Sequence, residues 1–381
     1  MKINNLLGLI ILILSTSVSY AQLPPASIAT MPMDNLASHG YFYVGGDYVG
    51  EPGQETMGGA MYVEVLVPKE IKHPNPIVFM HGNGQTGVSF LQTPDGRPGW
   101  AYNFLDMGYV VYVQDYPARG RSQYVPHIDG GLGMRSVATV EAIFTATAER
   151  ADYPRANLQT QWPGTGLRGD PVMDHYMKSQ VQYLTANQDQ MTIDANVALL
   201  DMIGEPVILL THSQGGRFGW NIADQRPSLV KAIVTSEPAA PPIHGVDSTN
   251  IEYRTTGGLP WGVSNAPITY DPLITSASEL QVELQNEAEG PDLIACYQQQ
   301  EPARQLVNLT ETPVLFITGE GSYHRIYDHC LANWLNQAGV DTEYVRLEDA
   351  GIYGNGHMMM LEENSKEIAE FIGSWLEANT L

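Results

Sequence analysis

One segment in the middle of the chain constrains the fold most, because an apolar strand must turn there directly into a helix. The strand comprises residues 207–210 (V-I-L-L), and the turn T-H-S-Q-G-G at residues 211–216 follows it. Residues 218–224 can then continue as a helix. A strand, a tight turn and a helix in this order predict a unit of a mostly parallel sheet.

Other short apolar runs share the composition of this strand and predict the rest of the sheet. They are rich in β-branched residues, as strands buried on both faces are. They lie at residues 61–67, 77–80, 109–113, 232–234, 314–318 and 344–347, and residues 365–376 have the pattern of an amphipathic helix. We therefore expect an α/β fold with a mostly parallel central sheet flanked by helices.

Two long stretches interrupt the alternation of strands and helices, at about residues 123–205 and 238–312. The first contains helix-like segments at 136–150 and 173–184, and the second contains one at 276–289. Insertions in such folds lie above the carboxyl ends of the strands, where ligands bind. We expect both stretches to be cap material within a single domain spanning residues 22–381.

The first 21 residues have the features of a secretory signal peptide. Lys2 precedes an apolar run at residues 6–14, and Ser19-Tyr20-Ala21 provides a small-x-small cleavage site. The run is shorter than the roughly 20 residues of a membrane span, and no cysteine suggests a lipid anchor. The sequence predicts a secreted or periplasmic protein without a membrane anchor, cleaved near Ala21.

Charge and cysteine content narrow the partners and the compartment. The formal net charge is −23 and no cluster of Lys and Arg is present, so nucleic acid is not an expected partner. The sequence has only two cysteines, Cys296 and Cys330. Export to an oxidising compartment permits a disulfide between them, although the sequence does not show whether their Cα atoms are close enough.

The turn after residues 207–210 is typical of a nucleophile elbow, in which a strained serine projects between a strand and a helix. The usual G-x-S-x-G is T-x-S-x-G here, with Ser213 as the candidate nucleophile. A His-Gly loop follows the strand at residues 77–80, as in oxyanion loops of this fold. The backbone amides of Asn83 and Gln214 are the expected oxyanion donors.

His357 is the candidate base, because it lies in G-N-G-H after the last strand and before the final helix. His324 and His329 are expected at the surface, near a helix start. In most members of this fold the acid is the Asp of a G-x-x-D turn after the strand that corresponds to residues 314–318. That turn reads G-E-G-S here, with Ser322 in place of the Asp. Glu237 ends the preceding strand, and we take it as the acid, with Glu320 as the rival.

Several motifs together resemble a small family of secreted bacterial esterases with the α/β-hydrolase fold. They include G-Y-F-Y-V-G-G at 40–46, T-P-D-G-R at 93–97, R-G-R-S at 119–122, H-S-Q at 212–214, S-E-P at 236–238 and H-M-M-M at 357–360. The resemblance implies a Ser213–His357–Glu237 triad with oxyanion amides at Asn83 and Gln214. That family can carry adjacent cysteines where this chain has Asn83 and Gly84.

The expected activity is hydrolysis of a small-molecule carboxylic ester through an acyl-enzyme on Ser213, with no cofactor. No H-E-x-x-H motif, Cys/His cluster or acidic calcium loop suggests a metal. A lactonase or amidase with the same triad, and a catalytically silent ligand-binding scaffold, remain alternatives. The sequence does not give the oligomeric state.

Overall fold

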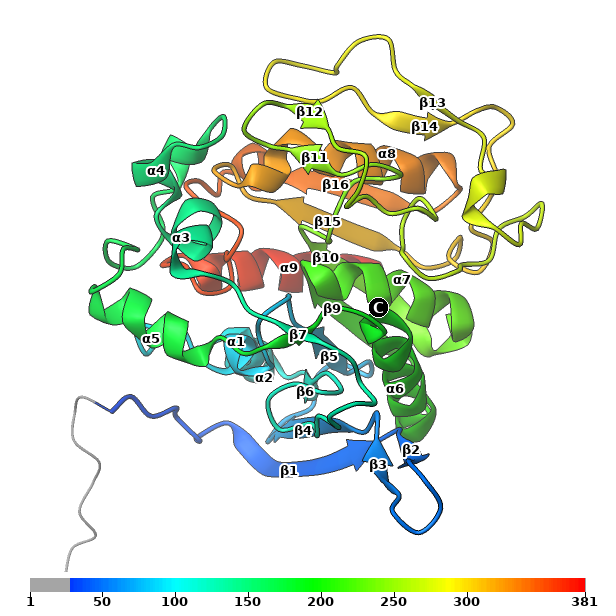
Figure 1. Ribbon diagram of the computed structural model, residues 1–381. Coiled ribbons are helices and arrows are strands. Elements are labelled where there is room, and N and C mark those ends of the chain that lie inside the picture. The colour runs from blue at the N-terminus through cyan, green and yellow to red at the C-terminus, as the bar shows by residue number, and fades with distance from the viewer. Residues whose placement is uncertain (1–27, 381) are drawn as a thin grey trace, which may run out of the picture. The chain divides into compact units, whose positions relative to one another are not determined.

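Eight strands form the central sheet, in the spatial order β1-β4-β6-β5-β9-β10-β15-β16 (Figure 1). The computed structural model describes residues 28–380, so the expected leader and its cleavage site at Ala21 lie outside the described residues. The strands are β1 (Leu36–Val44), β4 (Met61–Pro68), β5 (Ile77–Met80), β6 (Val111–Asp115), β9 (Val207–His212), β10 (Val230–Ser236), β15 (Val314–Thr318) and β16 (Thr342–Arg346).

The pairing of these strands confirms a mostly parallel sheet. β1 pairs antiparallel with β4, and β4 pairs antiparallel with β6. The pairings from β6 through β5, β9, β10 and β15 to β16 are all parallel. The carboxyl ends of β5, β9, β10 and β15 therefore meet at one edge of the sheet, where side chains distant in sequence can converge.

Alternating residues of the central strands enter two separate hydrophobic cores. In β9, Leu209 belongs to one core, whereas Ile208 and Leu210 belong to the other. Because both faces of the strand are buried, its residues 207–210 are continuously apolar.

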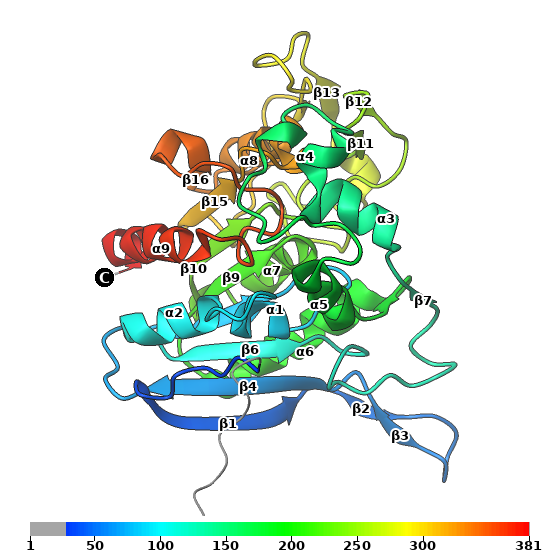
Figure 2. The same cartoon turned by 90° about the vertical axis from the view of Figure 1, so that its left-hand side faces the viewer.

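Helices cover both faces of the sheet. The first core takes side chains from α6 (Gln188–Ile203), α7 (Gln214–Gln225) and α8 (Asp328–Gln337), and the second takes them from α2 (Trp100–Met107), α5 (Pro171–Ser179) and α9 (Ser365–Thr380). α2 and α9 lie next to each other (Figure 2). The short helix α1 (Val88–Leu91) adds Phe90 to the second core. The predicted flanking helices are therefore present.

The first long stretch combines cap elements with a helix of the main body. Its smaller elements are β7 (Leu132–Gly133), α3 (Val137–Val140), the π-helical turn η1 (Glu141–Thr145), α4 (Thr147–Arg150), η2 (Ala156–Leu158), α5 and β8 (Tyr183–Leu184). α6 follows them and places Ile193, Leu199 and Leu200 in the first core. A cap boundary drawn at residue 205 thus includes a helix that packs on the sheet.

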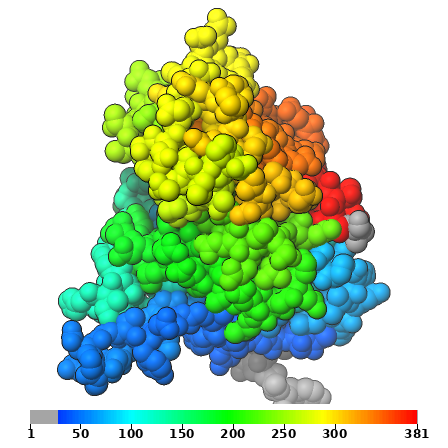
Figure 3. Space-filling view, turned by 90° about the vertical axis from the view of Figure 1, so that its right-hand side faces the viewer, coloured from blue at the N-terminus to red at the C-terminus, as the bar shows by residue number. Residues whose placement is uncertain are grey.

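The second long stretch packs broadly on the main body. It contains β11 (Val246–Asp247), β12 (Glu252–Tyr253), η4 (Ala277–Glu279), β13 (Val282–Leu284) and β14 (Tyr297–Gln299). Its residues Val263, Tyr270 and Leu306 belong to the first core, and the Trp334 Nε1–H of α8 donates to the Tyr270 hydroxyl at 3.1 Å. Figure 3 shows this stretch in yellow beside the orange segment that contains α8.

The sequence-based prediction was wrong at three places. The helix-like segment at 173–184 ends as α5 at Ser179, because Tyr183 and Leu184 pair with β7 instead. Residues 276–289 do not form a helix, because after the turn η4 the chain pairs antiparallel with β14, and pairing with a distant strand overrides local helix propensity. The edge strand β1 was missed, since much of it is exposed and its sequence lacks a buried apolar run. Two further short strands, β2 (Asp47–Val49) and β3 (Thr56–Gly58), form a hairpin after it.

Within residues 28–380, no helix combines the length and apolar character needed to cross a membrane.

Candidate active site

Ser213 lies in a strained turn between β9 and α7. Its φ is +52°, a region that non-glycine residues rarely occupy and that is concentrated at functional sites. Its backbone N–H donates to the Ser236 carbonyl at 3.0 Å, and its carbonyl accepts from the Ala239 N–H at 2.8 Å. These bonds hold the turn against the end of β10, so the strain is maintained by the neighbouring strand.

Small neighbours make this turn possible. A Cβ on Gly215 would lie 2.6 Å from the Met80 carbonyl, and one on Gly216 would lie 2.3 Å from Pro238 Cβ. Thr211, which departs from the usual glycine, hydrogen-bonds through Oγ1 to Thr235 Oγ1 at 2.8 Å. Its methyl group faces Gly219, where a Cβ would lie 3.1 Å away. The elbow geometry is thus kept with threonine at the first position.

His357 and Glu237 are in direct contact. His357 Nδ1 lies 2.6 Å from Glu237 Oε2, and both side chains are buried. Glu237 follows β10 with φ +48°, a second strained non-glycine residue at the same edge of the sheet. His357 Nε2 is buried and has no hydrogen-bond partner among residues 28–380. This nitrogen is therefore available to hydrogen-bond with a nucleophile or a leaving group. Such hydrogen bonds often form only when substrate is bound.

Ser322, which stands where the common fold pattern has an aspartate, supports Glu237. The Ser322 hydroxyl donates to Glu237 Oε2 at 2.6 Å, and the Gly319 N–H donates to Oε1 at 2.8 Å. Glu320, the rival acid, instead accepts from the Gly354 N–H at 3.1 Å and pairs with Arg155 at 3.3 Å. The structure thus places Glu237, and not Glu320, against His357 Nδ1.

Burial has opposite effects on the two pKa values. It raises the pKa of Glu237, aided by the charge of Asp328, while the Ser322 and Gly319 hydrogen bonds oppose the rise. Burial lowers the pKa of His357, and His212, His324 and Arg135 lower it further. The imidazole is consequently neutral near pH 7, the form that can accept a proton.

The two expected oxyanion residues are held by one arginine. Arg119 is buried, and its guanidinium donates to the Gly82 carbonyl at 3.1 Å, to Asn83 Oδ1 at 3.2 Å and to Gln214 Oε1 at 2.8 Å. Gln214 opens α7, so its N–H is one of the unpaired donors of the helix N-terminus. The Asn83 N–H makes no hydrogen bond in the part of the chain that the structure describes. Both amides remain free to bind a developing negative charge.

The oxyanion loop approaches the elbow very closely at Gly82. A Cβ there would lie 2.9 Å from His212 Nδ1 and 3.2 Å from Ser213 Cβ. His212 in turn contacts the His357 carbonyl through Nε2 at 2.9 Å. His81 faces away from this contact, toward Gly82 O and the Tyr116 N–H, and burial together with Arg119 lowers its pKa to about 3.

Aromatic rings pack around the candidate base, His357. The Phe144 ring, from the π-helical turn η1, stacks on His357 with centroids 5.1 Å apart, and His324 stacks on it at 4.7 Å. His324 is buried and its Nδ1 lies 2.8 Å from Asp328 Oδ1; His329 is buried as well. The expectation that both histidines lie at the surface was wrong, because the turn η5 (Tyr323–Ile326) and α8 pack inward against the site.

A cavity of about 360 Å³ is lined by neighbours of the candidate site, and not by Ser213, Glu237 or His357 themselves. Tyr323, whose ring centroid lies 5.1 Å from that of His357, forms part of its wall. Ile143 and Tyr153 of the first insertion and Ala239 and Pro241 of the second face it from other sides. Both insertions therefore contribute to the wall of this cavity.

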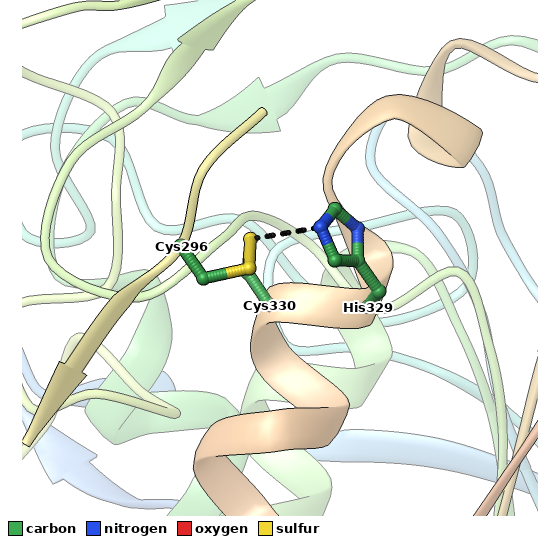
Figure 4. Close-up of side chains that lie close together, drawn as sticks. All are labelled: Cys296, His329 and Cys330. Atoms are coloured by element: carbon green, nitrogen blue, oxygen red, sulfur yellow. Dashed lines mark hydrogen bonds between the residues drawn. A yellow bond between two sulfur atoms is a disulfide. The ribbon is translucent and has the colours of Figure 1, made fainter. Parts of the chain in front are cut away.

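The structure joins Cys296 and Cys330 in a disulfide with Cα atoms 5.0 Å apart (Figure 4). His329 Nε2 lies 3.6 Å from Cys330 Sγ. These three residues, and likewise Glu237, His324 and His357, each bring potential metal-ligand atoms within 4.8 Å of one another. The sulfurs are bonded to each other and are not thiolates, and Glu237 already accepts three hydrogen bonds. Metal-free chemistry remains our prediction.

Comparison with known proteins identifies the family. A family profile describing the alpha/beta hydrolase fold matches residues 75–256. The chain is 44% identical over 342 residues to the "Probable secreted lipase phiG" of Fungal sp. (strain ATCC 74256), covering 88% of this chain and 89% of that protein. The chain belongs to the α/β-hydrolase family.

A solved esterase structure shares the fold across nearly the whole chain. It is described as "The Atomic Resolution Structure of a Novel Bacterial Esterase", with a TM-score of 0.59 and 23% identity. The match covers 95% of this chain and all of that one. The predicted α/β-hydrolase fold is confirmed, and the matching relatives include a fungal protein as well as a bacterial one.

Sequence reasoning missed several side chains that the hydrolase fold brings to the site. Ser322 carried a signal, since it occupies the position of the absent aspartate. Arg119 lay in a motif noted for resemblance, with no role assigned. Phe144 and Arg135 gave no signal, because their proximity to His357 depends on how the first insertion packs, and His324 was expected at the surface.

Proposed function

We propose that this protein is a carboxylic-ester hydrolase that acts through an acyl-enzyme on Ser213. The observation that carries the proposal is the 2.6 Å contact between His357 Nδ1 and Glu237, on loops next to the strained Ser213 turn. The 44% identity to a probable secreted lipase supports ester bonds as the target. A nucleophile, a base and a buried carboxylate are the three groups that acyl transfer requires.

In the proposed mechanism His357 Nε2 takes the Ser213 hydroxyl proton as Oγ attacks the ester carbonyl. The Asn83 and Gln214 amides bind the oxyanion, and Glu237 accepts the Nδ1–H bond and stabilises the imidazolium. The imidazolium then gives its proton to the leaving alcohol, and the acyl group stays on Ser213. Water attacks this ester in the same way, which releases the acid and restores the serine.

The test compares Ser213→Ala with Ser374→Ala, which removes an exposed hydroxyl on α9. Both variants and the wild type are treated with a fluorophosphonate and assayed against a panel of esters. We expect covalent labelling and hydrolysis in the wild type and Ser374→Ala, and neither in Ser213→Ala, with hydrolysis reduced by at least about 10⁴-fold. Labelling of Ser213→Ala, or hydrolysis at a tenth of the wild-type rate, would reject the proposal.

We also propose that the protein is exported and cleaved after Ala21. The support is the leader pattern, the secreted relative and the disulfide geometry between Cys296 and Cys330. N-terminal sequencing of the mature protein should begin at Gln22. A mature chain that begins at Met1 would contradict this.

A further inference from the structure

Arg135 is a cation without a polar partner next to the base and the oxyanion loop. Eight arginines in residues 28–380 form ion pairs with carboxylates: Arg97, Arg121, Arg150, Arg155, Arg217, Arg226, Arg254 and Arg325. Arg135 has neither an ion pair nor a hydrogen bond within that range, and its Nε atom is buried. Arg135 as a whole is half-buried, and in a chain with a formal net charge of −23 a cation whose buried nitrogen has no partner needs an explanation.

The position of Arg135 relates it directly to the reacting groups. Its guanidinium carbon lies 5.3 Å from the centroid of the Phe144 ring, the same ring that stacks on His357. On the other side, a Cβ added to Gly84, the residue after Asn83, would lie 3.8 Å from Arg135 Nε. Arg135 therefore lies near both Phe144, which packs on the proposed base, and Gly84 of the proposed oxyanion loop, and its charge contributes to lowering the pKa of His357.

Gln180 borders the same space and is also unsatisfied. Its side-chain oxygen lies 3.4 Å from the position of a Gly84 Cβ, and the adjacent Val181 N–H donates to the Gly84 carbonyl at 2.9 Å. Both polar atoms of the Gln180 side chain are buried and have no partner in the described part of the chain. Buried polar atoms are normally paired, so two side chains with unpaired buried atoms beside Gly84 form a site suited to a polar group.

We propose that Arg135 and Gln180 bind a carboxylate carried by the substrate, so that the preferred substrates are esters with a free carboxyl group, such as half-esters of dicarboxylic acids. This rests on the proposed ester hydrolysis at Ser213 and specifies its substrate class. A guanidinium and an amide N–H match carboxylate oxygens in charge and geometry. The acidic protein would otherwise repel such a substrate, which makes a local cation necessary.

The experiment compares monomethyl and dimethyl esters of succinic, glutaric and adipic acids, which present the same methyl ester with and without a carboxylate. Methanol release gives kcat/KM for each, corrected for the two ester groups of the diesters. We expect the wild type to prefer the half-ester for at least one chain length. Arg135→Met should lower the half-ester to diester ratio by about 10- to 150-fold, the range for a hydrogen bond to a charged group.

Two further variants separate specificity from general damage. Arg135→Lys should retain part of the preference, because lysine keeps the charge without the planar fork. Arg168→Met removes an exposed arginine and changes the net charge by the same amount as Arg135→Met. It should leave the half-ester to diester ratio unchanged. A wild type that prefers diesters at every length, or Arg135→Met lowering both substrates by the same factor, overturns the inference. If the inference fails in this way, loss of diester hydrolysis in Ser213→Ala would still support the esterase proposal.

Discussion

Replacing Glu237 with glutamine tests the acid assignment most sharply, because the glutamate is buried among three donors. Gly319 N–H donates to one oxygen, and Ser322 and His357 Nδ1 contact the other. Glutamine has the same shape but only one acceptor oxygen. If that oxygen faces His357, the amide NH₂ faces the Gly319 N–H, and an unpaired buried donor costs about 1–3 kcal/mol.

In the Glu237→Gln variant, the favoured side-chain orientation therefore points the amide oxygen at Gly319 and the NH₂ at His357. Nδ1 must then accept a hydrogen bond, which moves the ring proton to Nε2, the atom that should deprotonate Ser213. An imidazole in this tautomer cannot act as the base. From the effect of the equivalent acid-to-amide change in a serine protease, we expect kcat to fall by about 10³- to 10⁴-fold, or about 4–5.5 kcal/mol, with a small change in KM.

The assay measures kcat and KM for Glu237→Gln, Glu320→Gln and the wild type on one soluble ester. Glutamine keeps the shape of glutamate and buries no charge, so the variant should fold, and thermal unfolding checks this. Glu320→Gln should stay within about threefold of the wild type, since Glu320 contacts Gly354 and Arg155 instead. A folded Glu237→Gln with more than a tenth of the wild-type kcat would refute the reasoning, as would an equal loss in Glu320→Gln.

Three other predictions concern the same molecule. Arg119→Met should lower kcat by about 10- to 100-fold, because Asn83 and Gln214, whose amides are the proposed oxyanion donors, lose their hydrogen bonds to the Arg119 guanidinium. An unchanged kcat in folded protein would count against this. Because burial and neighbouring charges lower the pKa of His357, kcat/KM should hold constant from pH 8 to below 6.5 and fall only at lower pH as the ring protonates; a fall centred at pH 7 or above would contradict it. Replacing Cys296 and Cys330 with serine should lower the free energy of unfolding by roughly 4 kcal/mol, from the 34-residue separation, without changing kcat; identical urea unfolding with and without reductant would disprove the bridge.

The sequence predicted the strands that are buried on both faces and was weaker elsewhere. β5 and β15 matched at both ends because their continuous apolar runs have no other stable location than the sheet interior. Edge strand β1 was not predicted, because its exposed face carries both polar and aromatic residues. Residues 276–289 were misassigned because their pairing partner lies in a loop with no strand signal of its own.

The candidate site divides in the same way. Ser213 could be predicted because the residues of a tight turn are adjacent in the sequence. His357 could be predicted because it lies after the last strand and before the final helix. Glu237 depended on knowing which strand lies beside which, and the structure shows β10 between β9 and β15. Arg135 and Phe144 belong to an insertion whose packing no local pattern encodes, so their positions beside the base required three-dimensional information.

The contact between Glu237 and Ser322 has a consequence for how the acid of such a site is located. The two residues follow neighbouring parallel strands, yet both reach the same point next to His357. Side chains from the ends of two neighbouring strands therefore meet beside His357 Nδ1, one as the carboxylate and the other as its hydrogen-bond donor. The position of an acid in this fold is thus better described by its place beside the base than by its place in the sequence.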